Sequence, residues 1–151
     1  MVKDVLTFDS DAFSLEPPLD ERGRRYDLPI GDDIAAYLKD RLDVKGTVWK
    51  VGDVVEEDFG SVLMLRRDKE TFDVTVSWQG GKSWALVFGQ LRGCIGWLFD
   101  RKPAAKAIQE AKLLVNGVVS AEPERFRNAM WIGNDDFPGI ASAFVVRDKS
   151  R

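Results

Sequence analysis

The apolar positions between residues 34 and 42 recur with the spacing of a helix that buries one face. Steps of three and four residues place them in one stripe, which consists of Ile34, Tyr37, Leu38 and Leu42. Asp32 and Asp33 stand directly before this stripe, where carboxylates favour a helix N-terminus. Gly46 is typical of a residue that follows a helix. The pattern predicts a helix that begins near Asp32 and ends before Gly46.

Further along the chain the spacing of the apolar positions becomes two, which is typical of strands. Residues 72–79 alternate between apolar and polar side chains, and the Gly80-Gly81 pair that follows favours a hairpin to a strand at 83–90. Residues 47–51 and the apolar run 61–67 predict two earlier strands. Together these segments predict an antiparallel meander with one covered face and one wetter face.

The two ends of the chain have weaker patterns. Residues 1–30 are predicted to form a largely irregular N-terminal arm, in which residues 5–8 can add an extended segment to the sheet. Glycines interrupt the apolar stretch 91–100, which we interpret as a bent strand end or a buried connector. Residues 141–146 are candidates for a last strand.

A second helix is predicted to begin at Pro103, because proline is favoured at the first helical position. Its apolar stripe runs to Val115, and Asn116-Gly117 is expected to end it. The fold class that follows is α+β, with an antiparallel meander of about four strands and two helices packed on one face. No composition shift divides the chain, so residues 1–151 are expected to form a single domain.

Charge and cysteine content narrow the class of protein. The 22 basic and 25 acidic residues give a net charge of −3, which disfavours binding to nucleic acid. The basic run 22–25 is too short to change that conclusion. A single cysteine allows no intramolecular disulfide, and no apolar stretch approaches the roughly 20 residues of a membrane span. The N-terminal residues lack the apolar core of a signal peptide, so we expect a cytoplasmic protein without a membrane partner.

The absence of histidine removes several kinds of chemistry. Catalysis by Ser-His-Asp or Cys-His sets is excluded, as are zinc sites built on histidine. Cys94 lies in an apolar stretch and is better interpreted as a buried thiol than as a nucleophile. Neither a phosphate-binding GxxxxGK loop nor a GxGxxG pattern occurs, and no cofactor is predicted.

Carboxylates are the remaining candidates for a site. Glu56, Glu57 and Asp58 stand together before the strand at 61–67. With a distant acid such as Asp32 or Asp135 they could bind a divalent cation or provide an acid and a base. Neighbouring side chains on an extended segment point to opposite sides, so only two of the three acids can share one site. The simpler interpretation is a solvated loop.

Tryptophans are numerous, with five in this chain. Trp78 and Trp84 flank the Gly80-Gly81 turn, where they can form a cross-strand pair. Core packing accounts for most tryptophans, but an exposed aromatic residue beside an acidic rim would suit a basic protein surface. The binding candidates are therefore Glu57, Asp58, Phe59, Trp78 and Trp84.

Two short motifs carry a resemblance. Residues 28–38, with the start Gly31-Asp32-Asp33, and the segment Glu57-Asp58-Phe59-Gly60 resemble a group of small uncharacterised bacterial proteins. That group has a GDD(I/L/V)A helix start and an EDWG-like segment, and the similarity covers about residues 26–116. Phe59 stands here where tryptophan is more typical. In size and style the group is also similar to bacterial immunity proteins, which neutralise a toxin by covering it.

The leading hypothesis from the sequence is a non-catalytic module that binds a protein partner, of which an immunity or accessory role is one version. The alternative is a metal-binding protein or enzyme that uses Glu56, Glu57 and Asp58 with a distant aspartate. The sequence leaves the partner and the oligomeric state open.

Overall fold

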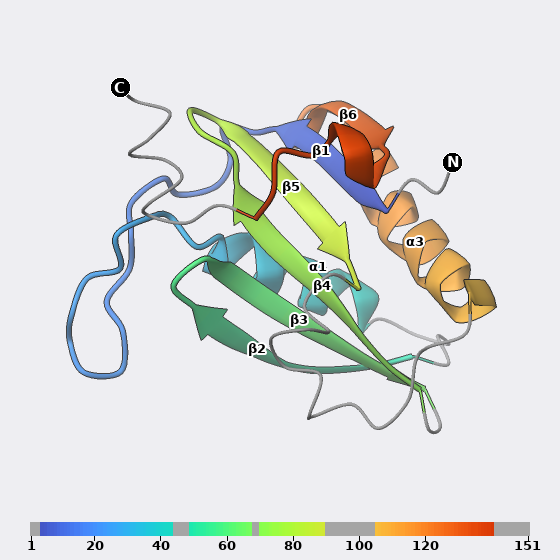
Figure 1. The fold of residues 1–151 in the computed structure, drawn as a ribbon, viewed down its shortest axis with the longest axis horizontal. Helices are drawn as coiled ribbons and strands as arrows, with labels where there is room; N and C mark the ends of the chain where they lie inside the picture. The colour runs from blue at the N-terminus through green and yellow to red at the C-terminus, as the bar shows by residue number, and fades with distance from the viewer. Residues whose placement is uncertain (1–3, 44–48, 68–69, 90–104, 141–151) are drawn as a thin grey trace.

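The computed structural model describes residues 4–43, 49–67, 70–89 and 105–140. Its six strands form one antiparallel sheet in the order β2-β3-β4-β5-β1-β6 (Figure 1). The strands are β1 (Val5–Asp9), β2 (Lys50–Glu57), β3 (Gly60–Arg67), β4 (Glu70–Trp78), β5 (Ser83–Phe88) and β6 (Arg127–Ile132). The helices are α1 (Asp32–Leu42), α3 (Ala105–Ser120) and the short 3-10 helix η2 (Asn134–Asp136).

The α+β class is confirmed, but the sheet is larger than predicted. The meander β2 to β5 is present, and β1 and β6 extend it beyond β5. The extended segment predicted near residue 5 is β1, which pairs with both β5 and β6. Strand β6 was not predicted, because its first four side chains are exposed and give no alternating apolar pattern.

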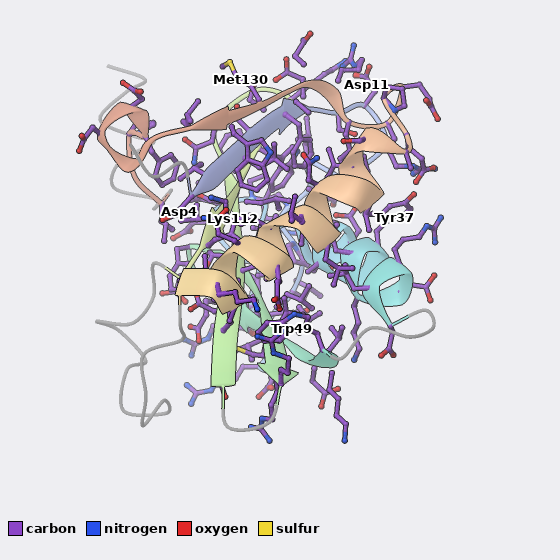
Figure 2. All side chains as sticks on the ribbon, turned by 90° about the vertical axis from the view of Figure 1, so that its right-hand side faces the viewer. Asp4, Asp11, Tyr37, Trp49, Lys112 and Met130 are labelled. Carbon is purple, nitrogen blue, oxygen red and sulfur yellow. The ribbon has the colours of Figure 1, made fainter. Side chains whose placement is uncertain are left out.

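Both helices pack on the same face of the sheet. The apolar stripe of α1 and the buried side of α3 belong to one core cluster with alternate residues of the central strands. Lys112 on α3 is buried, and its Nζ lies 3.1 Å from Oδ1 of Asp4, next to the start of β1 (Figure 2). Trp131 on β6 donates from Nε1 to Oδ1 of Asn116 over 2.9 Å. These contacts fix α3 beside β1 and β6.

The opposite face of the sheet is less exposed than predicted. Asp73, Thr75 and Ser77 on β4 point away from the helices, yet all three are buried. A small second cluster of Val5, Ala85 and Val87 also lies on that face, and Phe137 and Ile140 pack against it. The prediction of a wetter face was wrong for the centre of the sheet, because alternation separates two faces without showing what covers each.

Helix α3 extends beyond its predicted end at Asn116-Gly117. Its buried stripe continues past Val115 to Val119, and this continued burial outweighs the weak helix propensity of Gly117. The predicted start at Pro103, the segment 91–100 with Cys94, and the candidate strand 141–146 lie outside the described residues. None of the helices in the described part of the chain is long and apolar enough to span a lipid bilayer.

Replacing Gly117 with alanine is expected to stabilise the protein by roughly 0.5–1 kcal/mol. Gly117 is exposed within α3, and a Cβ atom there would meet no heavy atom within 4 Å. Alanine therefore lowers the backbone entropy of the unfolded chain without steric strain. Urea unfolding followed by circular dichroism measures the change. An unchanged or lower free energy of unfolding would show that this last turn is not helical in solution.

Candidate functional site

The acidic cluster lies at the end of a strand and in the tight turn that follows it. Glu56 and Glu57 are the last residues of β2, and Asp58-Phe59 connect β2 to β3, with Glu57 paired to Gly60. The sequence had predicted a strand at residues 47–51 and a separate acidic loop. The strand is instead longer, and a register shift between Val51 and Val54 interrupts the pattern that would have revealed it.

The glycines of the two short motifs both pack against Val76 of β4. Gly31 has a positive φ of 64°, and a Cβ atom there would lie 2.4 Å from Cγ1 of Val76. At Gly60 a Cβ atom would lie 2.0 Å from the carbonyl oxygen of Val76. The start of α1 and the β2–β3 turn are therefore held beside the same end of β4. This contact explains why both positions need glycine.

An open hollow of about 940 Å³ lies between the acidic end of β2 and residues 20–26 of the N-terminal arm. Five carboxylates and two guanidinium groups line it, so negative charge dominates. The lining residues are Asp20, Glu21, Arg22, Arg24, Tyr26, Val54, Val55, Glu56, Glu57 and Asp58. We call this feature the acidic hollow.

A compact turn positions the arm side of the acidic hollow. Oδ1 of Asp20 accepts hydrogen bonds from the backbone N–H groups of Arg22 and Arg24, each over 2.8 Å. Leu19 and Arg25 pair across the turn as an isolated antiparallel bridge. An aspartate that binds backbone groups two and four residues ahead stabilises such turns. The arm therefore presents a fixed wall, although the sequence had predicted a largely irregular segment.

A second anchor fixes the arm to the helix N-terminus. Oδ2 of Asp33 accepts a hydrogen bond from the backbone N–H of Ser14 over 2.7 Å, and Oδ1 accepts one from the N–H of Ile34 over 2.9 Å. Burial raises the pKa of the Asp33 carboxyl above its ordinary value. Asp33 thus connects the arm to α1. Of the two acids at this helix start, Asp33 therefore has a structural role.

Tyr26 is an aromatic residue in the lining of the acidic hollow, and the pKa of its phenol is raised above the ordinary value. Burial is the largest cause of the raised pKa, because it disfavours the charged phenolate. Negative charges raise the pKa further, and they come from Glu56, Asp20, Asp58 and Glu57. Carboxylates from both the arm and the end of β2 therefore raise the pKa of the same Tyr26 hydroxyl group.

Glu56→Gln is expected to lower the pKa of Tyr26, because the variant removes the strongest of the negative charges that disfavour the phenolate. Ultraviolet titration of tyrosinate absorbance measures the shift, and the chain has only two tyrosines. Tyr26→Phe assigns the transition. Glu16→Gln removes an exposed charge outside the hollow and should leave the titration unchanged. An unchanged pKa in the Glu56 variant would show that the two walls do not approach each other in solution.

The predicted binding residues have different environments. Glu57 and Asp58 line the acidic hollow, and the half-buried Phe59 belongs to the same turn without lining it. Trp78 and Trp84 form the predicted cross-strand pair. Trp78 is half-buried and donates from Nε1 to the carbonyl of Gly81 over 2.9 Å. Trp84 is completely buried in the core, so its prediction as a surface contact was wrong.

The weak metal candidates do not form a cation site in the described part of the chain. Asp32 lies at the start of α1, Glu56 in the acidic hollow, and Asp135 in η2. Across residues 4–43, 49–67, 70–89 and 105–140, no three His, Cys, Asp or Glu side chains are grouped so that they could hold a metal ion. The carboxylates that do gather line an open surface.

Sequence reasoning missed the arm residues of the site, namely Asp20, Glu21 and Tyr26. Residues 1–30 were predicted to form a largely irregular arm, and none of these three residues was named as a candidate. An aspartate followed by Arg22-Gly23-Arg24 was a usable signal for an ordered turn. The position of that turn against β2 depends on contacts between distant residues, which no local pattern encodes.

Comparisons of the chain with protein-family models, with curated proteins and with solved structures found no match.

Proposed function

We propose that this protein is a non-catalytic binding module that receives a basic segment of a partner protein in the acidic hollow. The observation that carries this proposal is the convergence of two separate chain segments on one concave, negatively charged surface around Tyr26. A simple solvated acidic loop would not be expected to have a second chain segment, residues 20–26, ordered against it. A concave surface with one sign of charge concentrates the electric field and attracts groups of opposite charge.

The composition of the acidic hollow suits a protein partner. Tyrosine is enriched at the energetic centres of protein interfaces, since it combines a large apolar area with a hydroxyl group. Val55 adds apolar surface, with 44% of its area exposed. The rim charges would accelerate association and select basic partners, while Tyr26 and Val55 would supply contact area.

Arg22 and Arg24 restrict the partner further, because they line the arm side of the same hollow. A uniformly basic chain would be repelled there. A segment whose lysines or arginines face Glu56, Glu57 and Asp58, and whose own acid or carbonyl groups face the arm, fits better. An immunity-like role, in which the partner is a basic toxin, is one version of this function.

The experiment compares two pairs of charge reversals. Wild-type protein is immobilised, and carbodiimide couples its carboxylates to lysines of proteins bound from native lysate. The test variant is Glu57→Lys with Asp58→Lys. The matched control is Asp135→Lys with Asp136→Lys, which reverses two neighbouring exposed acids in η2. Circular dichroism verifies that both variants are folded.

We expect wild type and control to bind the same partner, with cross-links at Glu56, Glu57 or Asp58. The affinity of the test variant should fall by about tenfold or more, as for the loss of close charge pairs at an interface. Equal recovery by both variants, or cross-links confined to other acids, would contradict the proposal.

A further inference from the structure

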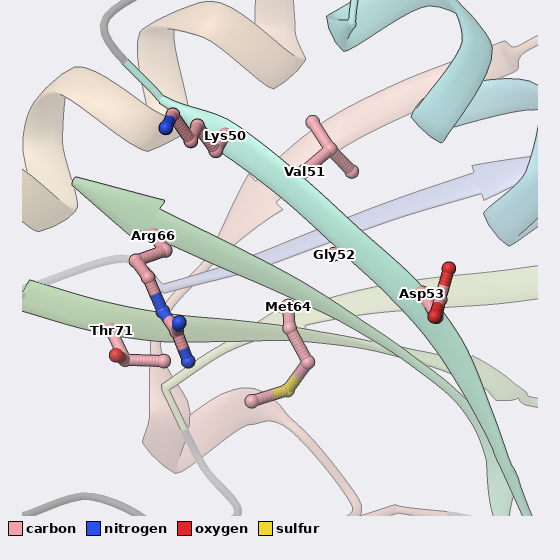
Figure 3. Close-up of a pocket in the computed structure, with 7 residues that line it drawn as sticks. All are labelled: Lys50, Val51, Gly52, Asp53, Met64, Arg66 and Thr71. Carbon is pink, nitrogen blue, oxygen red and sulfur yellow. The ribbon is translucent and has the colours of Figure 1, made fainter.

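A second hollow lies at the other end of the β2–β3 hairpin, on the sheet face opposite the helices (Figure 3). It has a volume of about 430 Å³ and differs in charge from the acidic hollow. Its lining residues are Lys50, Val51, Gly52, Asp53, Met64, Arg66 and Thr71. We call it the basic hollow.

A β-bulge and a glycine create the space. The register of β2 against β3 shifts between Val51 and Val54, a kind of irregularity that is common beside functional sites. Gly52 lies within this shift, and a Cβ atom there would contact Cβ of Met64 at 3.4 Å. Because glycine has no side chain, the surface above Met64 stays open.

One row of side chains crosses the basic hollow. Lys50 lies directly opposite Arg66, and Arg66 lies opposite Thr71 on the next strand. In Figure 3 the guanidinium group of Arg66 extends beside Thr71 and Met64. Like charges at directly opposed positions of a sheet destabilise it. Two cations at these positions repel each other, although both side chains are exposed and water screens the repulsion.

No acid in the described part of the chain neutralises these two cations. The side chains of Lys50 and Arg66 form no hydrogen bond or ion pair with another described residue. Asp53 is the acid in the lining, and its Oδ1 lies 3.3 Å from Nζ of Lys39. The neighbouring Arg67 differs, since it pairs with Glu110. The basic hollow thus holds two cations without a described partner and one acid that is already paired.

We propose that the basic hollow binds the phosphate group of a small phosphorylated molecule. The planar guanidinium of Arg66 can donate two parallel hydrogen bonds to one oxyanion, and Lys50 adds a second positive charge. The hydroxyl of Thr71 can donate a third hydrogen bond. Met64 offers apolar contact to the organic part of the molecule beside Gly52. This proposal is independent of the acidic hollow and of its partner.

Calorimetric titration with inorganic phosphate and with phenyl phosphate tests the proposal at constant ionic strength. We expect wild type to bind both, and phenyl phosphate more tightly. Arg66→Gln and Lys50→Gln should each weaken binding by about tenfold, the effect of one lost charge-assisted contact. Arg41→Gln is the matched control, because it removes an exposed arginine in the last turn of α1, outside both hollows, and should leave the affinity unchanged.

The Gly52→Leu variant distinguishes a site for a phosphate ester from a site for inorganic phosphate alone. Leucine should fill the space above Met64 and remove the preference for phenyl phosphate, while inorganic phosphate still binds. Equal affinity for both probes in wild type would overturn the phosphate-ester assignment. Equal losses in the Arg41 and Arg66 variants, or no measurable heat with either probe, would overturn the site itself.

Thermal unfolding provides a second, independent measurement. Without phosphate, Arg66→Gln and Lys50→Gln should melt at the same temperature as wild type or higher, because each removes a repulsion. With phosphate, the melting temperature of wild type should rise and that of the variants should not. Destabilised variants without phosphate would show that the two cations have structural partners, which would contradict the proposal.

Discussion

A Gly60→Ala variant is expected to lose roughly 3–5 kcal/mol of stability, which is a large share of the free energy of unfolding of a typical domain. Gly60 has a φ of 153°, and a Cβ atom there would lie 2.0 Å from the carbonyl oxygen of Val76. That oxygen belongs to the backbone of β4, so no flexible side chain can move aside. Relief requires the β2–β3 turn to separate from β4.

Urea unfolding measures this loss, and Gly80→Ala is the matched control. Gly80 also has a positive φ, of 98°, but a Cβ atom there would meet no heavy atom within 4 Å. The control should therefore show only the backbone strain, about 1–2 kcal/mol. The difference between the two variants isolates the steric contact with Val76. Similar losses in both would show that β4 yields at this point and that the close approach is not a rigid constraint.

Within the motif Glu57-Asp58-Phe59-Gly60, the glycine has a structural role that the two acids do not share. The glycine is required by backbone contact, whereas Glu57 and Asp58 line an open hollow, and their side chains form no hydrogen bond with a described residue. These two acids can therefore change with little effect on folding. This freedom is why the charge reversals at Glu57 and Asp58 test binding and not stability.

Local patterns were sufficient to predict α1 and the hairpin of β4 with β5. The helix has its apolar stripe and its acidic first turn within the 11 residues Asp32–Leu42, so the relevant interactions are local, while the predicted stop at Gly46 lies outside the described residues. The hairpin has alternation on both sides of two glycines with positive φ. In each case the residues that decide the structure are close in sequence to the residues that adopt it.

The position of β1 could not be predicted in the same way. Strand β1 lies between β5 and β6. Its residues pair with residues of β5 about 80 positions away in the chain and with residues of β6 about 120 positions away. Strand β6 is an edge strand with mostly exposed side chains, and Trp131 within it faces the helices but gives no alternating pattern on its own. Strand order that depends on such distant pairing leaves little trace in the local sequence.

Only one of the two walls of the acidic hollow was predicted from the sequence. The acids at the end of β2 were recognisable as a cluster, but the opposite wall comes from residues 20–26, which precede them by a helix and most of a strand. The basic hollow was not predicted at all. Lys50 and Arg66 are separated in sequence, and only the register of β2 with β3 brings them opposite each other.

The two tryptophans at the β4–β5 turn show what alternation can and cannot reveal. Their shared face was predicted, and it is the face that packs against the helices. Burial differs because Trp78 lies at the end of its strand, whereas Trp84 lies beneath the N-terminus of α1. A Cβ atom at Gly31 would lie 2.9 Å from Cζ3 of Trp84. The period of a strand gives the face of a residue, not its depth.

Trp84→Ala is expected to destabilise the protein by about 3–5 kcal/mol, the range for removing a fully buried aromatic side chain. Trp84 has 0% of its surface exposed and is among the largest side chains of the core. The loss combines the transfer of the indole to water with the cavity that it leaves between β4, β5 and α1. Urea unfolding followed by far-ultraviolet circular dichroism measures it.

Trp84→Phe should lose much less, about 1–2 kcal/mol, because it keeps most of the apolar volume. The indole Nε1 of Trp84 is buried without a hydrogen-bond partner in the described part of the chain, so phenylalanine also removes an unsatisfied polar group. Trp78→Ala is the half-buried control and should lose less than Trp84→Ala, about 1–2 kcal/mol, with its hydrogen bond to Gly81. Partner capture by Trp84→Phe should equal that of wild type per folded molecule. A folded Trp84→Phe protein that fails to capture the partner would contradict a purely structural role for this residue.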